Sequence, residues 1–175
     1  MPENILAVSR KSKTFIYLIT DLVIITAIYS LPSLSHITSI PFYLFEPMRL
    51  ALVFCIINTN RNNSLIIALT LPILSLIISA HPVFAKSVLI TGELTINVYL
   101  FYVIAKRLDN KFFVMLFSIL AAKSFYYSGK LMFIGFGFLS GDLVSTPLWI
   151  QFLMMLLFSL YAVFSVKNDQ GVRLT

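Results

Sequence analysis

Lys86, Glu93 and Asn97 are separated by seven and then by four residues in an otherwise apolar stretch. A helix with this spacing carries all three side chains on one face. A cation, a carboxylate and an amide on one face can bind a small polar molecule. Lys86 would contact an anionic group, and Glu93 and Asn97 would contact amine or ring donors.

A second polar stripe begins 37 residues further along the chain. Lys123, Tyr127 and Lys130 follow spacings of four and three residues, and Tyr126 adjoins them. We expect Lys123 to contact the anionic group of a ligand as well, and the two tyrosines to supply packing faces and hydroxyl groups. The two stripes would then line one cavity from neighbouring antiparallel helices.

The surroundings of these residues indicate a membrane. Of 175 residues, 59% are hydrophobic and 11% are charged, and the mean hydropathy of +0.93 lies far outside the range of soluble domains. An ionised side chain in hydrocarbon costs about 2.5–3.5 kcal/mol. The charged groups are therefore expected to face a polar interior rather than lipid.

The apolar stretches predict an all-α integral membrane protein, with residues 1–175 forming one membrane domain that is a bundle of six transmembrane helices. Their lengths lie near the ~17–25 residues that cross a bilayer, and strand-like alternation is not visible. Asp21 within the first stretch argues against a cleaved signal peptide. Pro72 interrupts the short third stretch, so five spans are an alternative. The expected spans are residues 14–31, 43–58, 64–80, 84–106, 112–131 and 147–166.

Basic residues predict the orientation of this bundle, because Lys and Arg accumulate in short cytoplasmic loops. An orientation with both termini inside places nine of the thirteen Lys and Arg residues on the cytoplasmic side. The net charge of +6 is then explained by attraction of these residues to the anionic inner leaflet, and it does not require a nucleic-acid partner. We expect a multi-pass protein of the bacterial cytoplasmic membrane. The nine residues are Arg10, Lys11, Lys13, Arg61, Lys106, Arg107, Lys111, Lys167 and Arg173.

The other four cations fall in the outer half of the predicted bundle, together with three acids. This excess of cations favours a ligand with a carboxylate or phosphate, although a pair of Glu93 and Lys123 would suit a zwitterion equally. A structural role is the alternative, in which lysines reach the headgroups or that pair joins two helices. The residues are Arg49, Lys86, Lys123 and Lys130, with Glu46, Glu93 and Asp142.

Two outer connections complete the predicted site. Residues 31–47 contain three prolines and an aromatic cluster, and they form either a lid over the cavity or an interfacial loop. The glycine-rich residues 133–147 predict an irregular connection, with Trp149 as an interfacial anchor. His81, in the turn before residue 84, either donates a hydrogen bond to the ligand or caps the turn. Only His36 accompanies it, so no metal site is expected.

Several functions are disfavoured by missing motifs. The chain has no GxxxxGK[ST] phosphate loop, no HExxH and no GxSxG, so we expect neither an enzyme nor a cofactor. Cys55 is the only cysteine, which excludes an intramolecular disulfide, and we expect it to be a buried apolar filler. Asp21 has no obvious partner.

Residues 61–131 resemble the substrate-binding S-components of energy-coupling factor transporters. The likeness lies in the "HP" turn with the following Lys86, "EL" with a following Asn, "KR" at the next inner turn, and "K..YY". The resemblance implies six helices with both ends cytoplasmic, and a vitamin-like nutrient bound near the outer face. It also implies a separate scaffold membrane subunit and two cytoplasmic ATPases. Many members carry Ala-x-x-x-Ala in the first span for docking, which this chain lacks.

Two other functions are alternatives. In a non-transporting scaffold subunit, of the rod-shape-determining type, the polar stripes would hold partner helices instead of a small molecule. A self-sufficient carrier or channel is less favoured, because no inverted repeat is detectable.

Overall fold

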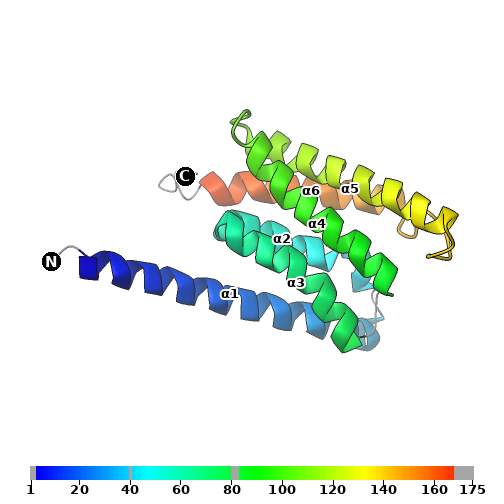
Figure 1. Ribbon diagram of the computed structural model, residues 1–175, viewed down its shortest axis with the longest axis horizontal. Helices are drawn as coiled ribbons and strands as arrows, with labels where there is room; N and C mark the ends of the chain where they lie inside the picture. Colours follow the sequence, from blue (N-terminus) through cyan, green and yellow to red (C-terminus); the bar gives the residue numbers. More distant parts are fainter. Residues whose placement is uncertain (1–2, 40, 80–82, 168–175) are drawn as a thin grey trace.

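The computed structural model describes residues 3–39, 41–79 and 83–167, and every regular element within these ranges is a helix (Figure 1). The observed fold is therefore all-α, as the sequence predicts. The elements are α1 (Glu3–Thr38), the 3₁₀ helix η1 (Phe42–Phe45), α2 (Pro47–Asn58), α3 (Arg61–Ser79), α4 (Phe84–Ile104), α5 (Lys111–Gly135) and α6 (Leu148–Lys167).

The last three helices lie within a few residues of the apolar stretches that predict them. The start of α5 also has a local signal. The side chain of Asn110 accepts a hydrogen bond from the backbone N–H of Phe112 at 3.0 Å, so it caps the start of α5. The first predicted span differs more, because α1 continues to Thr38 through residues expected to form an outer loop.

Pro72 lies inside α3 and does not end the helix. A proline inside a helix has no N–H, so the carbonyl four residues earlier, that of Ala68, loses its usual intrahelical donor. The hydroxyl of Ser87 on α4 donates to the carbonyl of Pro72 itself at 2.9 Å, which is a separate contact. This buried contact fixes α4 against α3.

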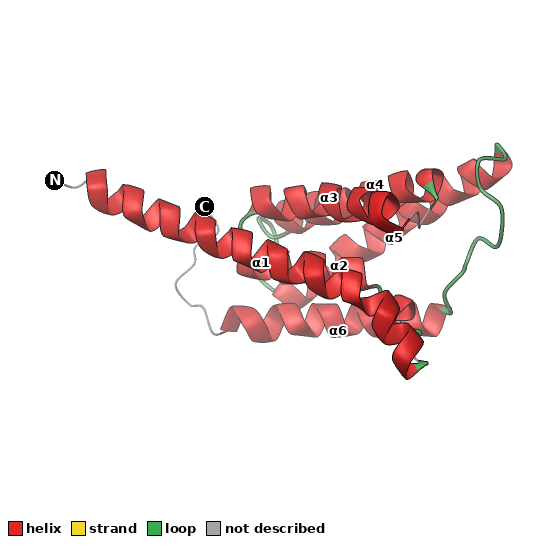
Figure 2. Ribbon diagram, turned by 90° about the horizontal axis from the view of Figure 1, so that it is seen from below, coloured by secondary structure: helices red, strands yellow, loops and turns green. Residues whose placement is uncertain are grey.

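The chain reverses direction after each α-helix, so α1 begins and α6 ends at the same end of the molecule (Figure 1). Helix α4 packs between α3 and α5, and α6 packs on α5. Helix α1 lies along the outside of the bundle against α2, α3 and η1, and its first turns extend beyond the other helices (Figure 2). Helix α2 is central, with Leu52, Val53 and Cys55 fully buried.

Three helices are long and apolar enough to cross a membrane: α4, α5 and residues Leu148–Ser165 of α6. The apolar parts of the others are shorter, namely Tyr17–Ser30, Pro47–Asn58 and Arg61–Ile77. Large apolar side chains are exposed on the outside of the bundle, including Leu18, Leu157 and Phe164. Such a surface is typical of helices that face lipid.

Candidate functional site

The site begins where the connection after η1 enters α2. Glu46 immediately precedes the helix in the left-handed backbone conformation, with φ of 51° and ψ of 57°, and Pro47 occupies the first helical position. One turn later, Arg49 places its Nε 3.2 Å from Oε2 of Glu46. An acid and a base are thus paired at the start of α2, a helix whose other buried residues are apolar.

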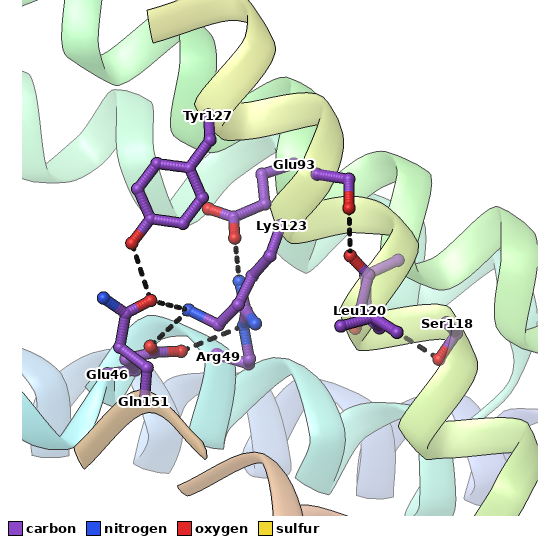
Figure 3. Close-up of polar contacts among 10 residues, drawn as sticks. Glu46, Arg49, Glu93, Ser118, Leu120, Lys123, Tyr127 and Gln151 are labelled. Carbon is purple, nitrogen blue, oxygen red and sulfur yellow. Dashed lines mark hydrogen bonds and ion pairs between the residues drawn. The ribbon is translucent and has the colours of Figure 1, made fainter. Parts of the chain in front are cut away.

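Arg49 also reaches across to α4, where its Nη2 donates a hydrogen bond to Oε1 of Glu93 (Figure 3). Both residues are buried, with 3% and 7% of their surfaces exposed. The sequence-based pairing of Glu93 with Lys123 therefore needs correction, since the ion-pair partner of Glu93 is Arg49. Arg49 lies in the first turn of α2, and its long side chain reaches the middle of α4, where Glu93 lies.

Lys123 on α5 contacts the other acid of the site. Its Nζ lies 2.5 Å from Oε1 of Glu46 and donates a hydrogen bond to Oε1 of Gln151 on α6 at 3.0 Å. The hydroxyl of Tyr127 donates to the same Gln151 oxygen at 2.7 Å. Gln151 in turn donates from Nε2 to the carbonyl of Thr146 at 2.7 Å, at the end of the connection between α5 and α6.

These six residues form what we call the ionic network: Glu46, Arg49, Glu93, Lys123, Tyr127 and Gln151 (Figure 3). Two acids balance two bases, so the network is electroneutral when all four groups are ionised. Its members come from α2 and the residue before it, α4, α5 and α6. Gln151 was not among the predicted site residues. The signal for it is a lone amide within the apolar sequence "LWIQFLMMLL".

Asn97 lies one turn beyond Glu93 on the same face of α4 and is fully buried. Its Nδ2 donates to the hydroxyl of Ser118 on α5 at 3.2 Å, and Ser118 donates to the carbonyl of Met115 at 2.9 Å. The Asn97 Oδ1 atom has no hydrogen-bond partner within the described part of the chain. An unused buried acceptor beside the network is a place for a donor from water or a ligand.

Lys130 does not belong to the network. Its Nζ donates to the carbonyls of Asp142 and Leu143 at 2.7 and 2.8 Å, so it holds the connection between α5 and α6. Lys86 is half-buried near the start of α4, and the Tyr126 ring packs edge-on against that of Tyr127 at 5.4 Å. His81 lies outside the described residues.

Asp21 has a partner on another helix, which the sequence did not reveal. Its Oδ1 accepts a hydrogen bond from Nδ2 of Asn63 at the start of α3 at 2.8 Å, and the Cys55 thiol lies 3.8 Å from the same oxygen. Cys55 is buried, as expected, and its thiol is directed at a carboxylate. This contact joins α1 to α2 and α3, near the turn between α2 and α3.

Comparison with protein-family models, curated proteins and solved structures found no match for this chain. The fold and the site therefore define its class: an all-helical bundle, with three helices able to cross a membrane, that encloses a neutral ionic network. The polar groups of this network can exchange their mutual contacts for contacts with a polar molecule. They are two carboxylates, a guanidinium, an ammonium, a phenol and an amide.

Proposed function

We propose that this chain is the substrate-binding membrane subunit of an importer of the energy-coupling factor type. It captures a small organic nutrient, vitamin-like and zwitterionic or anionic, at the outer side of the bacterial cytoplasmic membrane. The ionic network carries the proposal, because four helices and the residue before α2 bring their polar groups to one place in an apolar bundle. Convergent polar groups in an apolar surround are characteristic of small-molecule sites.

The energetics support a binding role for the network. Removing charges from water carries a desolvation cost that mutual attraction often only offsets, and apolar residues of similar volume frequently stabilise a fold equally well. The bundle already has an apolar core around Leu52, Leu71 and Ile119. A network of two buried and two half-buried charges beside such a core is better explained by recognition of a polar ligand.

Six spans with both termini in the cytoplasm are part of this proposal. The beginning of α1, the end of α6, and the turns after α2 and α4 share one end of the bundle (Figure 1). These turns and the residues beside them carry Arg61, Lys106, Arg107 and Lys111. The positive-inside tendency places this end in the cytoplasm and the network, near the beginning of α2, in the outer half.

The short helix α2 fits this arrangement. Its 12 residues span about 18 Å, less than the ~30 Å hydrocarbon layer. Helix α2 contacts α1, α3, α4, α6 and η1, while its Leu50 and Phe54 side chains are exposed. Arg49 near its beginning is buried in protein rather than exposed to lipid.

In this proposal the chain binds the nutrient but catalyses no reaction. Energy comes from two cytoplasmic ATPase subunits, coupled through a scaffold membrane subunit. The scaffold would dock on an apolar face exposed to lipid. Helix α1 offers such a face, with Leu18, Leu22 and Val23 exposed, although it lacks the Ala-x-x-x-Ala spacing.

The proposal is tested by identifying what the protein retains. Protein purified in mild detergent is denatured, and the released small molecules are analysed by mass spectrometry. We expect one organic compound to be enriched with the unaltered protein and reduced at least tenfold with Glu93→Gln or Lys123→Met. Lys111→Gln, at the first residue of α5 and outside the ionic network, is the matched control and should retain it. A compound profile that is identical in all four proteins would contradict a binding role.

A scaffold subunit of a larger membrane complex is the second candidate, favoured by one observation. The four charges pair with one another, as they would in a bundle that the ion pairs merely stabilise. In that case no small molecule is enriched, and partner proteins copurify after mild solubilisation. Network variants then lower the melting temperature without changing the profile of released compounds.

A further inference from the structure

We propose that the space between Arg49 and Lys123 is a carboxylate-binding subsite, and that Glu46 occupies it in the ligand-free protein as a displaceable substitute for a ligand carboxylate. This inference rests on the proposed function, since it names a chemical group that the captured nutrient carries. It differs from the sequence-based assignment, in which Lys86 rather than Arg49 accompanies Lys123.

The two oxygens of Glu46 are held by different cations. Oε1 lies 2.5 Å from Nζ of Lys123, and Oε2 lies 3.2 Å from Nε of Arg49 (Figure 3). The cations belong to α5 and α2, so they bracket the carboxylate from two sides. Charge-assisted contacts of this kind also fix the carboxylate of a free ligand.

Arg49 has donors that Glu46 does not satisfy. Its Nε is close to Oε2 of Glu46, but the N–H does not align to form a hydrogen bond, and Nη1 has no acceptor within the described residues. Arg49 is 3% exposed, and unsatisfied donors at such depth are unfavourable. A carboxylate that is free of the backbone can turn to meet these donors, whereas the tether of Glu46 restricts its approach.

Glu46 is also the member of the network best placed to leave. Its side chain is 17% exposed, against 9% for Glu93. Glu93 is fixed in the middle of α4, whereas Glu46 belongs to the connection between α1 and α2. Its φ of 51° lies in a region that residues other than glycine rarely adopt, so a change of conformation there relieves strain. A ligand that replaces Glu46 would thereby rearrange the adjoining connection.

Chemical rescue with acetate tests this subsite without knowledge of the ligand. The full-length Glu46→Ala variant is purified in mild detergent, and its melting temperature is measured as acetate replaces chloride at constant sodium concentration. Acetate then fills the vacated space between the two cations. At ten times its dissociation constant we expect it to raise the melting temperature by about 3–6 °C. The unaltered protein, in which Glu46 occupies the subsite, should need at least tenfold more acetate.

Two controls decide the interpretation. The double variant Glu46→Ala/Lys123→Met lacks one of the cations and should lose the response, and acetamide, which has no charge, should not replace acetate. The same response to acetate in Glu46→Ala, the double variant and the unaltered protein would overturn the subsite. If Glu46→Ala does not yield folded protein, Glu46→Gln replaces it. A weaker but saturable response is then expected, and no response overturns the inference.

The outcome is distinguishable from that of the proposed function. Release of a nutrient without a carboxylate, together with no acetate response in Glu46→Ala, refutes the subsite and leaves the uptake function intact. A saturable acetate response without any retained nutrient establishes the subsite and removes support for uptake.

Discussion

Arg49 is the residue on which the ionic network depends, because it is buried more deeply than the other charges and pairs with both acids. Removing one member of a buried pair leaves the partner charged and without compensation, which costs more than removing both. The contribution of Arg49 therefore has to be measured together with that of Glu93.

Arg49→Met should lower the free energy of unfolding by about 3–5 kcal/mol, because it leaves Glu93 buried without its cation. Arg49→Met/Glu93→Gln removes both charges. Its loss of unfolding free energy should be smaller than the sum of the losses in the two single variants by about 1–3 kcal/mol. The measurement is a double-mutant cycle from unfolding of the purified proteins. Lys86→Met, outside the network, serves as the control, and strictly additive single effects would show that the pair is not coupled.

Helices α4 and α5 approach closely through two glycines, one on each helix. A Cβ atom at Gly129 of α5 would lie 2.7 Å from Cδ2 of Leu89, and one at Gly92 of α4 would lie 3.1 Å from Cε1 of Phe125. The neighbours differ in freedom, since Leu89 is 5% exposed and Phe125 is 48% exposed. Phe125 can therefore move outward, whereas Leu89 is confined by the core.

Gly129→Ala should consequently be less stable than Gly92→Ala by about 1–3 kcal/mol, the usual cost of overpacking a confined site. Both changes gain the same helix propensity, so the two variants are matched controls for each other. Melting temperatures in detergent provide the comparison. Leu89→Ala combined with Gly129→Ala should recover part of the loss. Equal stabilities for the two glycine variants would mean that Leu89 can move as freely as Phe125.

At the scale of the whole molecule, the reversal of the chain after each α-helix decides where charges and termini lie. The two ends of the described chain share one end of the bundle with the basic turns, whereas the network lies near the beginning of α2 (Figure 1). A membrane orientation that places the basic turns in the cytoplasm therefore places the network nearer the outside.

Reporter fusions test this orientation directly. A carboxyl-terminal green fluorescent protein should be fluorescent, and an alkaline phosphatase fused at the same place should be inactive, because we expect that end to lie in the cytoplasm. Phosphatase inserted between Gly137 and Gly141, in the connection from α5 to α6, should be active. Activity at the carboxyl terminus and none in that connection would reverse the proposed orientation.

The helical class and the approximate bounds of α4, α5 and α6 can be predicted from local pattern, because long apolar runs have few other stable arrangements. Helical spacing also placed Glu93 and Asn97 on one face, and the structure buries both. Both inferences depend on neighbours along one helix, which periodicity alone specifies.

Which charges pair cannot be predicted from local pattern, because it depends on how the helices pack. Arg49 and Glu93 are 44 residues apart, and their contact depends on the relative height of α2 and α4, which no local pattern encodes. The same holds for Glu46 with Lys123, for Asp21 with Asn63, and for Gln151, whose surroundings in the sequence are almost entirely apolar. Pairing across helices is set by packing of the whole bundle, because a shift of one turn between two helices changes every partner.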